Sequence, residues 1–221
     1  MSSTLIHLRK FLPLVLPHAP GCSDFVATFN LRIAAIEFCE RTLCWRHISN
    51  VTLNKDGKAL TAPPYAAIHK IESATFDDEI ALEPLQYSHV DEAAFAETAG
   101  ATPQYITQAE YNKVRVLPYR EGKLSLSLFL KPVNGSEMIE DFDGMVSDAY
   151  DVVPEFIYTM HAEAIAAGAL SRLLVQPNKP WANPQAAMMW GQKATDAMET
   201  HFTANITGQH RARRRTKYHD F

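Results

Sequence analysis

Apolar residues recur at helical spacing near the start of the chain. The apolar positions are Phe25, Phe29, Ile33 and Ile36. Steps of three and four residues are typical of an amphipathic helix, and the serine at position 23 suits its N-cap. The pattern therefore predicts a helix from about residue 23 to residues 42–45.

From about residue 47 the spacing changes to that of short strands. Residues 51–53 precede an Asp-Gly pair at 56–57, which predicts a hairpin. Further alternation or strand composition follows at 65–71, 104–107, 113–117 and 124–130. We therefore expect an antiparallel meander, in the form of a small sandwich or barrel.

The last third returns to helical spacing. Pro154 and Glu155 suit the first turn of one helix, whose alanines and glycine predict close packing against another helix or subunit. Asn183 and Pro184 suit the start of a second helix that ends near Ile206. The residues that we expect to carry helix packing and assembly are Gly168, Ala169, Leu170, Leu174 and Trp181.

These elements predict an α+β fold in which an antiparallel β domain is inserted into a helical core. The core comprises residues 22–46 and 150–208, and the β-rich insertion comprises residues 47–149. Three prolines and a glycine within residues 11–21 disfavour a regular helix there, so we expect residues 1–21 to form an extended N-terminal arm. Residues 209–221 form a basic C-terminal tail.

Composition and charge narrow the function classes. The chain has 221 residues, 47% of them hydrophobic, which is enough for a sizeable core. Its net charge of -4 combines +4 over residues 211–221 with -8 over the preceding 210 residues. The three cysteines match no disulfide framework and favour a reducing compartment. The apolar runs are too short to predict export or a membrane span.

The candidate catalytic and metal motifs are each incomplete. His161 and Glu163 have the spacing of a zinc deaminase pair, but the Pro-Cys-x-x-Cys motif that holds the metal is missing. Cys39, Cys44 and His47 have no structural-zinc spacing. Residues 141–144 match part of a calcium loop that lacks its closing glutamate. We therefore expect no enzyme activity, no metal and no cofactor.

The basic tail is the strongest binding signal. Its cations repel one another and favour an anionic partner, which is either nucleic-acid phosphate or an acidic protein surface. A nucleic-acid-binding regulator is accordingly the alternative function. The candidate docking residues are Arg211, Arg213, Arg214, Arg215, Lys217, Tyr218 and Phe221.

The last third also resembles a known protein family. Residues 167–174 read Ala-Gly-Ala-Leu-Ser-Arg-Leu-Leu, and residues 177–184 read Pro-Asn-Lys-Pro-Trp-Ala-Asn-Pro. This pattern, with a preceding helix and β region, is similar to the head-to-tail adaptor proteins of tailed bacteriophages, also called connector or neck proteins. The motif region covers about residues 150–206.

The resemblance implies a structural virion protein made in the host cytoplasm. It implies a homo-oligomeric ring, usually of twelve copies, at the head-tail interface. The C-terminal segment would contact the portal protein, and the β region would face a tail or nozzle protein. DNA would pass through the ring without specific binding, because an acidic lumen repels phosphates. No membrane partner is implied.

Overall fold

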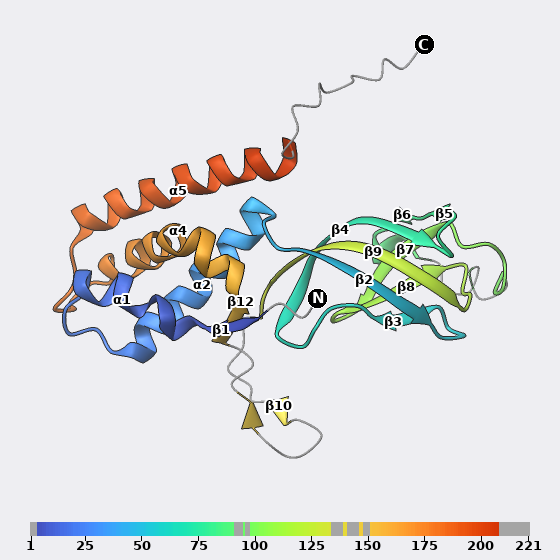
Figure 1. Ribbon diagram of the computed structural model, residues 1–221, viewed down its shortest axis with the longest axis horizontal. Helices are drawn as coiled ribbons and strands as arrows, with labels where there is room; N and C mark the ends of the chain where they lie inside the picture. Colours follow the sequence, from blue (N-terminus) through green and yellow to red (C-terminus); the bar gives the residue numbers. More distant parts are fainter. Residues whose placement is uncertain are drawn as a thin grey trace, which may run out of the picture.

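The computed structural model describes residues 4–90, 95, 98–133, 139–140, 146–147 and 151–207. It confirms a mixed α+β protein with mainly antiparallel sheets. The longer helices gather at one end of the molecule and the two larger sheets at the other (Figure 1). The chain passes from the helical end into the sheets after α2 and returns to it before α4.

Three long helices form the helical end. They are α2 (Asp24–Thr42), α4 (Glu155–Leu174) and α5 (Pro184–Thr207). The predicted starts are confirmed at α2 and α5: the Ser23 hydroxyl accepts a hydrogen bond from the Val26 amide, and the Asn183 side chain accepts one from the Ala186 amide. Both bonds satisfy amides that have no partner within the helix.

The prediction of an extended N-terminal arm is wrong for the described part of residues 1–21. Strand β1 (Leu5–His7) pairs with β12 (Val152–Pro154). Three short helices then follow: η1 (Leu8–Phe11), α1 (Leu12–Val15) and η2 (Leu16–His18). Proline occupies the first turn of both α1 and η2, where its missing amide breaks no helical hydrogen bond. This segment contributes to the core, because its Leu8, Phe11 and Val15 side chains are completely buried.

Two four-stranded sheets form the other end. The first has the order β2 (Arg46–Leu53), β9 (Gly122–Pro132), β4 (Ala66–Phe76) and β5 (Ile80–Ala81). The second has the order β3 (Lys58–Leu60), β8 (Lys113–Leu117), β7 (Tyr105–Glu110) and β6 (Glu83–Pro84). Neighbouring strands are antiparallel except for the parallel pair β6–β7. The remaining described elements are η3 (Tyr87–His89), β10 (Ile139–Glu140) and β11 (Val146–Ser147).

The hairpin predicted around residues 51–57 is confirmed in its turn but not in its strand pairing. The turn exists, because the Gly57 amide donates to the Asn54 carbonyl at 2.9 Å. The strands on either side of it do not pair with each other, however: β2 pairs with β9, and β3 pairs with β8. The turn therefore carries the chain from one sheet to the other, and long-range pairing decides the partners.

Helix α2 buries a different face from the one that its large apolar residues mark. An amphipathic stripe is expected to face the core, yet Phe25 is 80% exposed and Phe29 is 45% exposed. The buried side of α2 combines the small residues Ala27, Ala34 and Ala35 with the larger Leu31 and Phe38. Small side chains allow α4 to approach closely, so helix packing decides which face is buried.

Candidate functional site

Four of the five helix-packing residues predicted from the sequence are buried in α4. Gly168 of α4 lies against α2: a Cβ atom added to it would be 3.3 Å from the Cβ of Ala34 and 4.0 Å from that of Ala194 in α5. Ala169, Leu170 and Leu174 of the same helix are buried. Gly168 is thus one point where all three long helices come close together.

Trp181 forms the corner between α4 and α5. Its side chain is partly buried and packs against the hydrophobic core. The Asn183 amide donates to the Leu174 carbonyl at 2.8 Å, which holds the start of α5 beside the end of α4. The Lys179 ammonium lies 5.9 Å from the centre of the indole ring, within reach of a cation–π contact. These contacts fix the direction in which α5 leaves the corner.

Ion pairs connect α2 to its neighbours. Glu37 accepts from the Arg172 guanidinium of α4 at 2.6 Å, and Glu40 accepts from the Lys131 ammonium of β9 at 2.6 Å. The second pair joins the helical end to the first sheet. Exposed pairs of this kind add little stability, so their main effect is on orientation.

The candidate docking residues of the basic tail lie outside the described residues, as does all of 208–221. The structure does show the element that leads to them. Helix α5 lies along the outside of the helical end, with its C-terminal part toward the sheets (Figure 1).

Two exposed apolar surfaces were not anticipated by sequence reasoning. Phe25 and Phe29 form the first on α2, and Met188 and Met189, which are 78% and 70% exposed, form the second on α5. The N-terminal end of α2 and helix α5 border different sides of the helical end (Figure 1). Periodicity identifies such stripes but does not show which of them faces outward.

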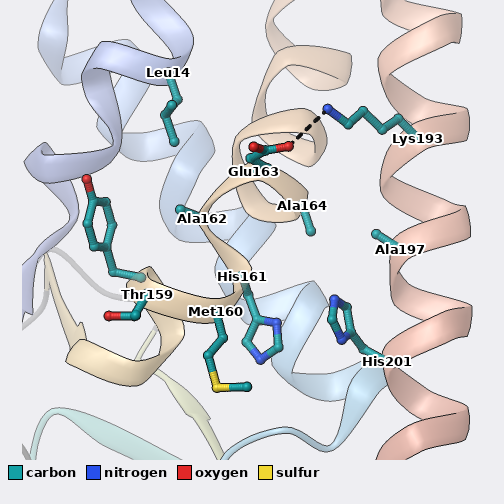
Figure 2. A pocket seen from close by; sticks show the side chains of 11 residues that line it. Leu14, Thr159, Met160, His161, Ala162, Glu163, Ala164, Lys193, Ala197 and His201 are labelled. Atoms are coloured by element: carbon teal, nitrogen blue, oxygen red, sulfur yellow. Dashed lines mark hydrogen bonds and ion pairs between the residues drawn. The ribbon is translucent and has the colours of Figure 1, made fainter.

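The side chains of His161 and Glu163 point in different directions. Figure 2 shows Glu163 pointing toward Lys193 of α5, with 3.4 Å between the carboxylate and the ammonium. The His161 imidazole is buried and points instead toward His201 of α5. A cavity of about 690 Å³ lies beside these residues, and Leu14 of α1 also lines it. The arrangement thus gives the carboxylate and the imidazole different partners on α5.

Two of the other candidate metal ligands, Cys39 and Cys44, contact each other through a hydrogen bond. Cys39 is completely buried, and its hydrogen bond with Cys44 and its burial raise the pKa of its thiol, which keeps it protonated. Burial lowers the pKa of His47, which lies on β2. Asp141 and Asp143 lie outside the described residues. Among the residues that the structure describes, no three ligand-type side chains are grouped so as to hold a metal ion.

Comparison with known proteins adds no relative. No family model matches the chain, and no curated protein matches it either. In the described part of the chain, none of the helices combines the length and apolar character needed to cross a membrane.

Proposed function

We propose that this chain is a non-enzymatic virion component of a tailed bacteriophage, an adaptor that joins the capsid portal to the tail. The observation that carries the proposal is the α4–α5 hairpin. Its Ala-Gly-Ala-Leu-Ser-Arg-Leu-Leu segment packs on α2, and its Pro-Trp corner leads into α5. In the proposal α2, α4 and α5 are the helical core, and the strands between α2 and α4 are an inserted β domain.

The exposed apolar surfaces support a ring of identical subunits. A ring requires two different surfaces on each protomer, because each subunit contacts its neighbours head to tail. Phe25 and Phe29 on α2 provide one such surface, and Met188 and Met189 on α5 provide the other. Twelve copies is the number that the family resemblance implies.

The charge distribution supports a DNA channel. Residues 72–110 contain nine carboxylates and no lysine or arginine. Several of these are exposed around β4–β6, namely Asp77, Asp78, Glu79 and Glu83. Carboxylates that face a lumen repel the DNA phosphates. DNA would therefore pass without the binding affinity that a basic lumen would gain from counterion release. We place the β region toward a tail or nozzle protein.

The basic tail is proposed to contact the portal. It follows directly on α5 and carries five basic residues between positions 211 and 217. The protein would be made in the host cytoplasm and would act at the head-tail interface of the virion. If the tail contacts the portal, binding requires the portal protein. If the tail binds nucleic acid, affinity for DNA falls steeply as the salt concentration rises, so experiment distinguishes the two roles.

The test is electron microscopy of the purified chain mixed with the portal protein of the same phage. We expect a ring of this protein seated on the portal, and we expect deletion of residues 211–221 to weaken that attachment while leaving the melting temperature unchanged. A full-length chain that stays monomeric and never joins the portal would contradict the proposal. Binding to DNA that falls steeply with salt and is lost on the same deletion would favour the regulator instead.

A further inference from the structure

Three helices meet at a cluster of aromatic rings that includes two histidines. The His161 ring of α4 and the His201 ring of α5 are 4.5 Å apart at an angle of 79° between their planes. Phe38 of α2 contacts both, with ring centres 5.0 Å from His161 and 5.8 Å from His201. Figure 2 shows the two imidazoles facing each other across the space between α4 and α5. The contact therefore joins the C-terminal half of α5 to the rest of the helical end.

The His161 side chain is buried without full hydrogen bonding. It is 6% exposed, and its buried Nδ1 atom has no hydrogen-bond partner among the described residues. A neutral imidazole tolerates this position better than an imidazolium, which needs two acceptors and loses more solvation on burial. The site therefore favours the uncharged ring.

The charged groups on the neighbouring elements are engaged elsewhere. On α4, Glu163 pairs with Lys193 of α5 and points away from the rings. On α2, Glu37 pairs with Arg172 and with Arg41, at 2.6 Å and 3.6 Å. The part of α1 that lines the cavity contributes an aliphatic leucine.

Two further acidic groups are engaged as well: Glu40 of α2 pairs with Lys131 of β9, and Asp196 of α5 accepts a hydrogen bond from Gln192. A third is Glu199 of α5. It lines a separate groove with Arg41, Met198 and Phe202. Among the described residues, no carboxylate is recorded in a hydrogen bond or ion pair with either imidazole. A proton on His161 therefore gains no counter-charge from α1, α2, α4 or α5, and one on His201 would repel it.

Burial, followed by the charge of His201, lowers the pKa of His161 to about 4. Once α5 moves away the imidazole regains water, and its pKa returns toward the ordinary value of about 6.5. The open form, in which α5 has moved away, therefore binds the proton on His161 more tightly than the closed form, in which α5 is packed against α2 and α4. The closed form is therefore fully favoured above about pH 6.5 and loses up to about tenfold in population per pH unit as the pH falls toward 4.

We propose that the contact between His161 and His201 is an acid-sensitive connection that holds the C-terminal half of α5 against α2 and α4. Protonation places positive charge in a buried site with no counter-charge and separates the helices. The adjoining cavity, on which both imidazoles border, gives water a route to the rings as α5 leaves. Because residues 208–221 follow α5 directly, release also changes where the basic tail is presented. This inference does not depend on the adaptor proposal.

The test is hydrogen exchange of the full-length protein between pH 7 and 4.5, with rates corrected for intrinsic pH dependence. We expect peptides covering residues 194–203 to lose protection by about tenfold or more across this range, while those of α4 after His161 keep theirs. His161→Phe, which packs against Phe38 but cannot be protonated, should abolish that loss. His69→Gln on β4 removes a histidine from the β region and should leave the loss unchanged.

Three results would overturn the proposal. The first is an equal acid-induced loss of hydrogen-exchange protection in α5 of the wild type and of His161→Phe. The second is a wild type in which α5 keeps full protection at pH 4.5. Should His161→Phe fail to fold, the histidine side-chain resonances of the wild type give an independent measurement. His161 must stay neutral until α5 opens, so ordinary titration near pH 6.5 with α5 still protected would also refute the connection.

Discussion

At Gly168 a single missing side chain decides how closely the helices pack. A Cβ atom added at this position would lie only 3.3 Å from the Cβ of Ala34. The branched side chain introduced by Gly168→Leu therefore has no room. We expect this substitution to lower the free energy of unfolding by about 1–3 kcal/mol through overpacking, measured by urea denaturation. It should also reduce subunit association.

Gly191 of α5 provides the matched control. Its added Cβ would lie 3.7 Å from the Cβ of Ser171, which is an ordinary contact. Gly191→Ala should therefore raise the free energy of unfolding by up to about 1 kcal/mol through helix propensity. If Gly168→Leu were as stable as Gly191→Ala, the close packing of α4 on α2 would not contribute to stability.

Asn112, in the turn between β7 and β8, connects the two sheets. Its amide group donates to the Ala66 carbonyl at 2.6 Å and accepts from the Ile68 amide at 3.1 Å, and its own carbonyl accepts from the Thr61 amide. The side chain is 2% exposed, and the φ angle of 55° lies in the left-handed region that asparagine tolerates. One residue thus satisfies backbone groups of β4 and of the preceding loop.

We expect Asn112→Ala to lower the free energy of unfolding by about 2–4 kcal/mol. The substitution removes two buried hydrogen bonds, leaves their backbone partners unsatisfied and strains the left-handed position. Thermal and urea unfolding measure the loss. Asn112→Asp keeps the acceptor, and its carboxyl group replaces the lost donor only when it is protonated. The loss of unfolding free energy should therefore be smaller than that of Asn112→Ala only at pH values where this carboxyl group is protonated. A neutral Asn112→Ala would show that the sheets do not depend on this bridge.

At the scale of elements, the sequence predicts what local chemistry controls. The caps at Ser23 and Asn183 and the starts of α2 and α5 follow from short-range hydrogen bonding, and most strands of the two sheets are found near their predicted positions. The pairing of β1 with β12 joins residues about 150 positions apart, so no local pattern indicates it. The burial of Leu8, Phe11, Leu12 and Val15 was missed because prolines in this segment begin helical turns instead of preventing them.

The candidate site was only partly accessible from the sequence. The small residues around Gly168 predicted close packing, and the structure gives that packing its partner, Ala34. The direction of the Phe25 and Phe29 stripe could not be predicted, because α2 has a second apolar face, and that face brings Ala34 against Gly168 of α4. The meeting of His161 with His201 depends on how α5 folds back along α4, which local spacing does not specify.

At the scale of the whole molecule, the exposed phenylalanines should act in assembly and not in folding. Replacing Phe25 and Phe29 together with serine should change the melting temperature little, since both are exposed, and should reduce oligomer formation at least tenfold. Analytical ultracentrifugation with and without the portal measures this. Ile48→Ser on β2, where the side chain is 70% exposed, is the matched control and should assemble normally. Normal assembly of the phenylalanine variant would assign the subunit contact to another surface.

The adaptor proposal is tested most directly by cryo-electron microscopy of mature phage particles, reconstructed without imposed symmetry. The account predicts a closed ring of this chain between portal and tail, with α2 of one subunit beside α5 of the next and the acidic β surface near the channel. Particles that lack the protein, or that carry it as a single copy away from the portal, would contradict it.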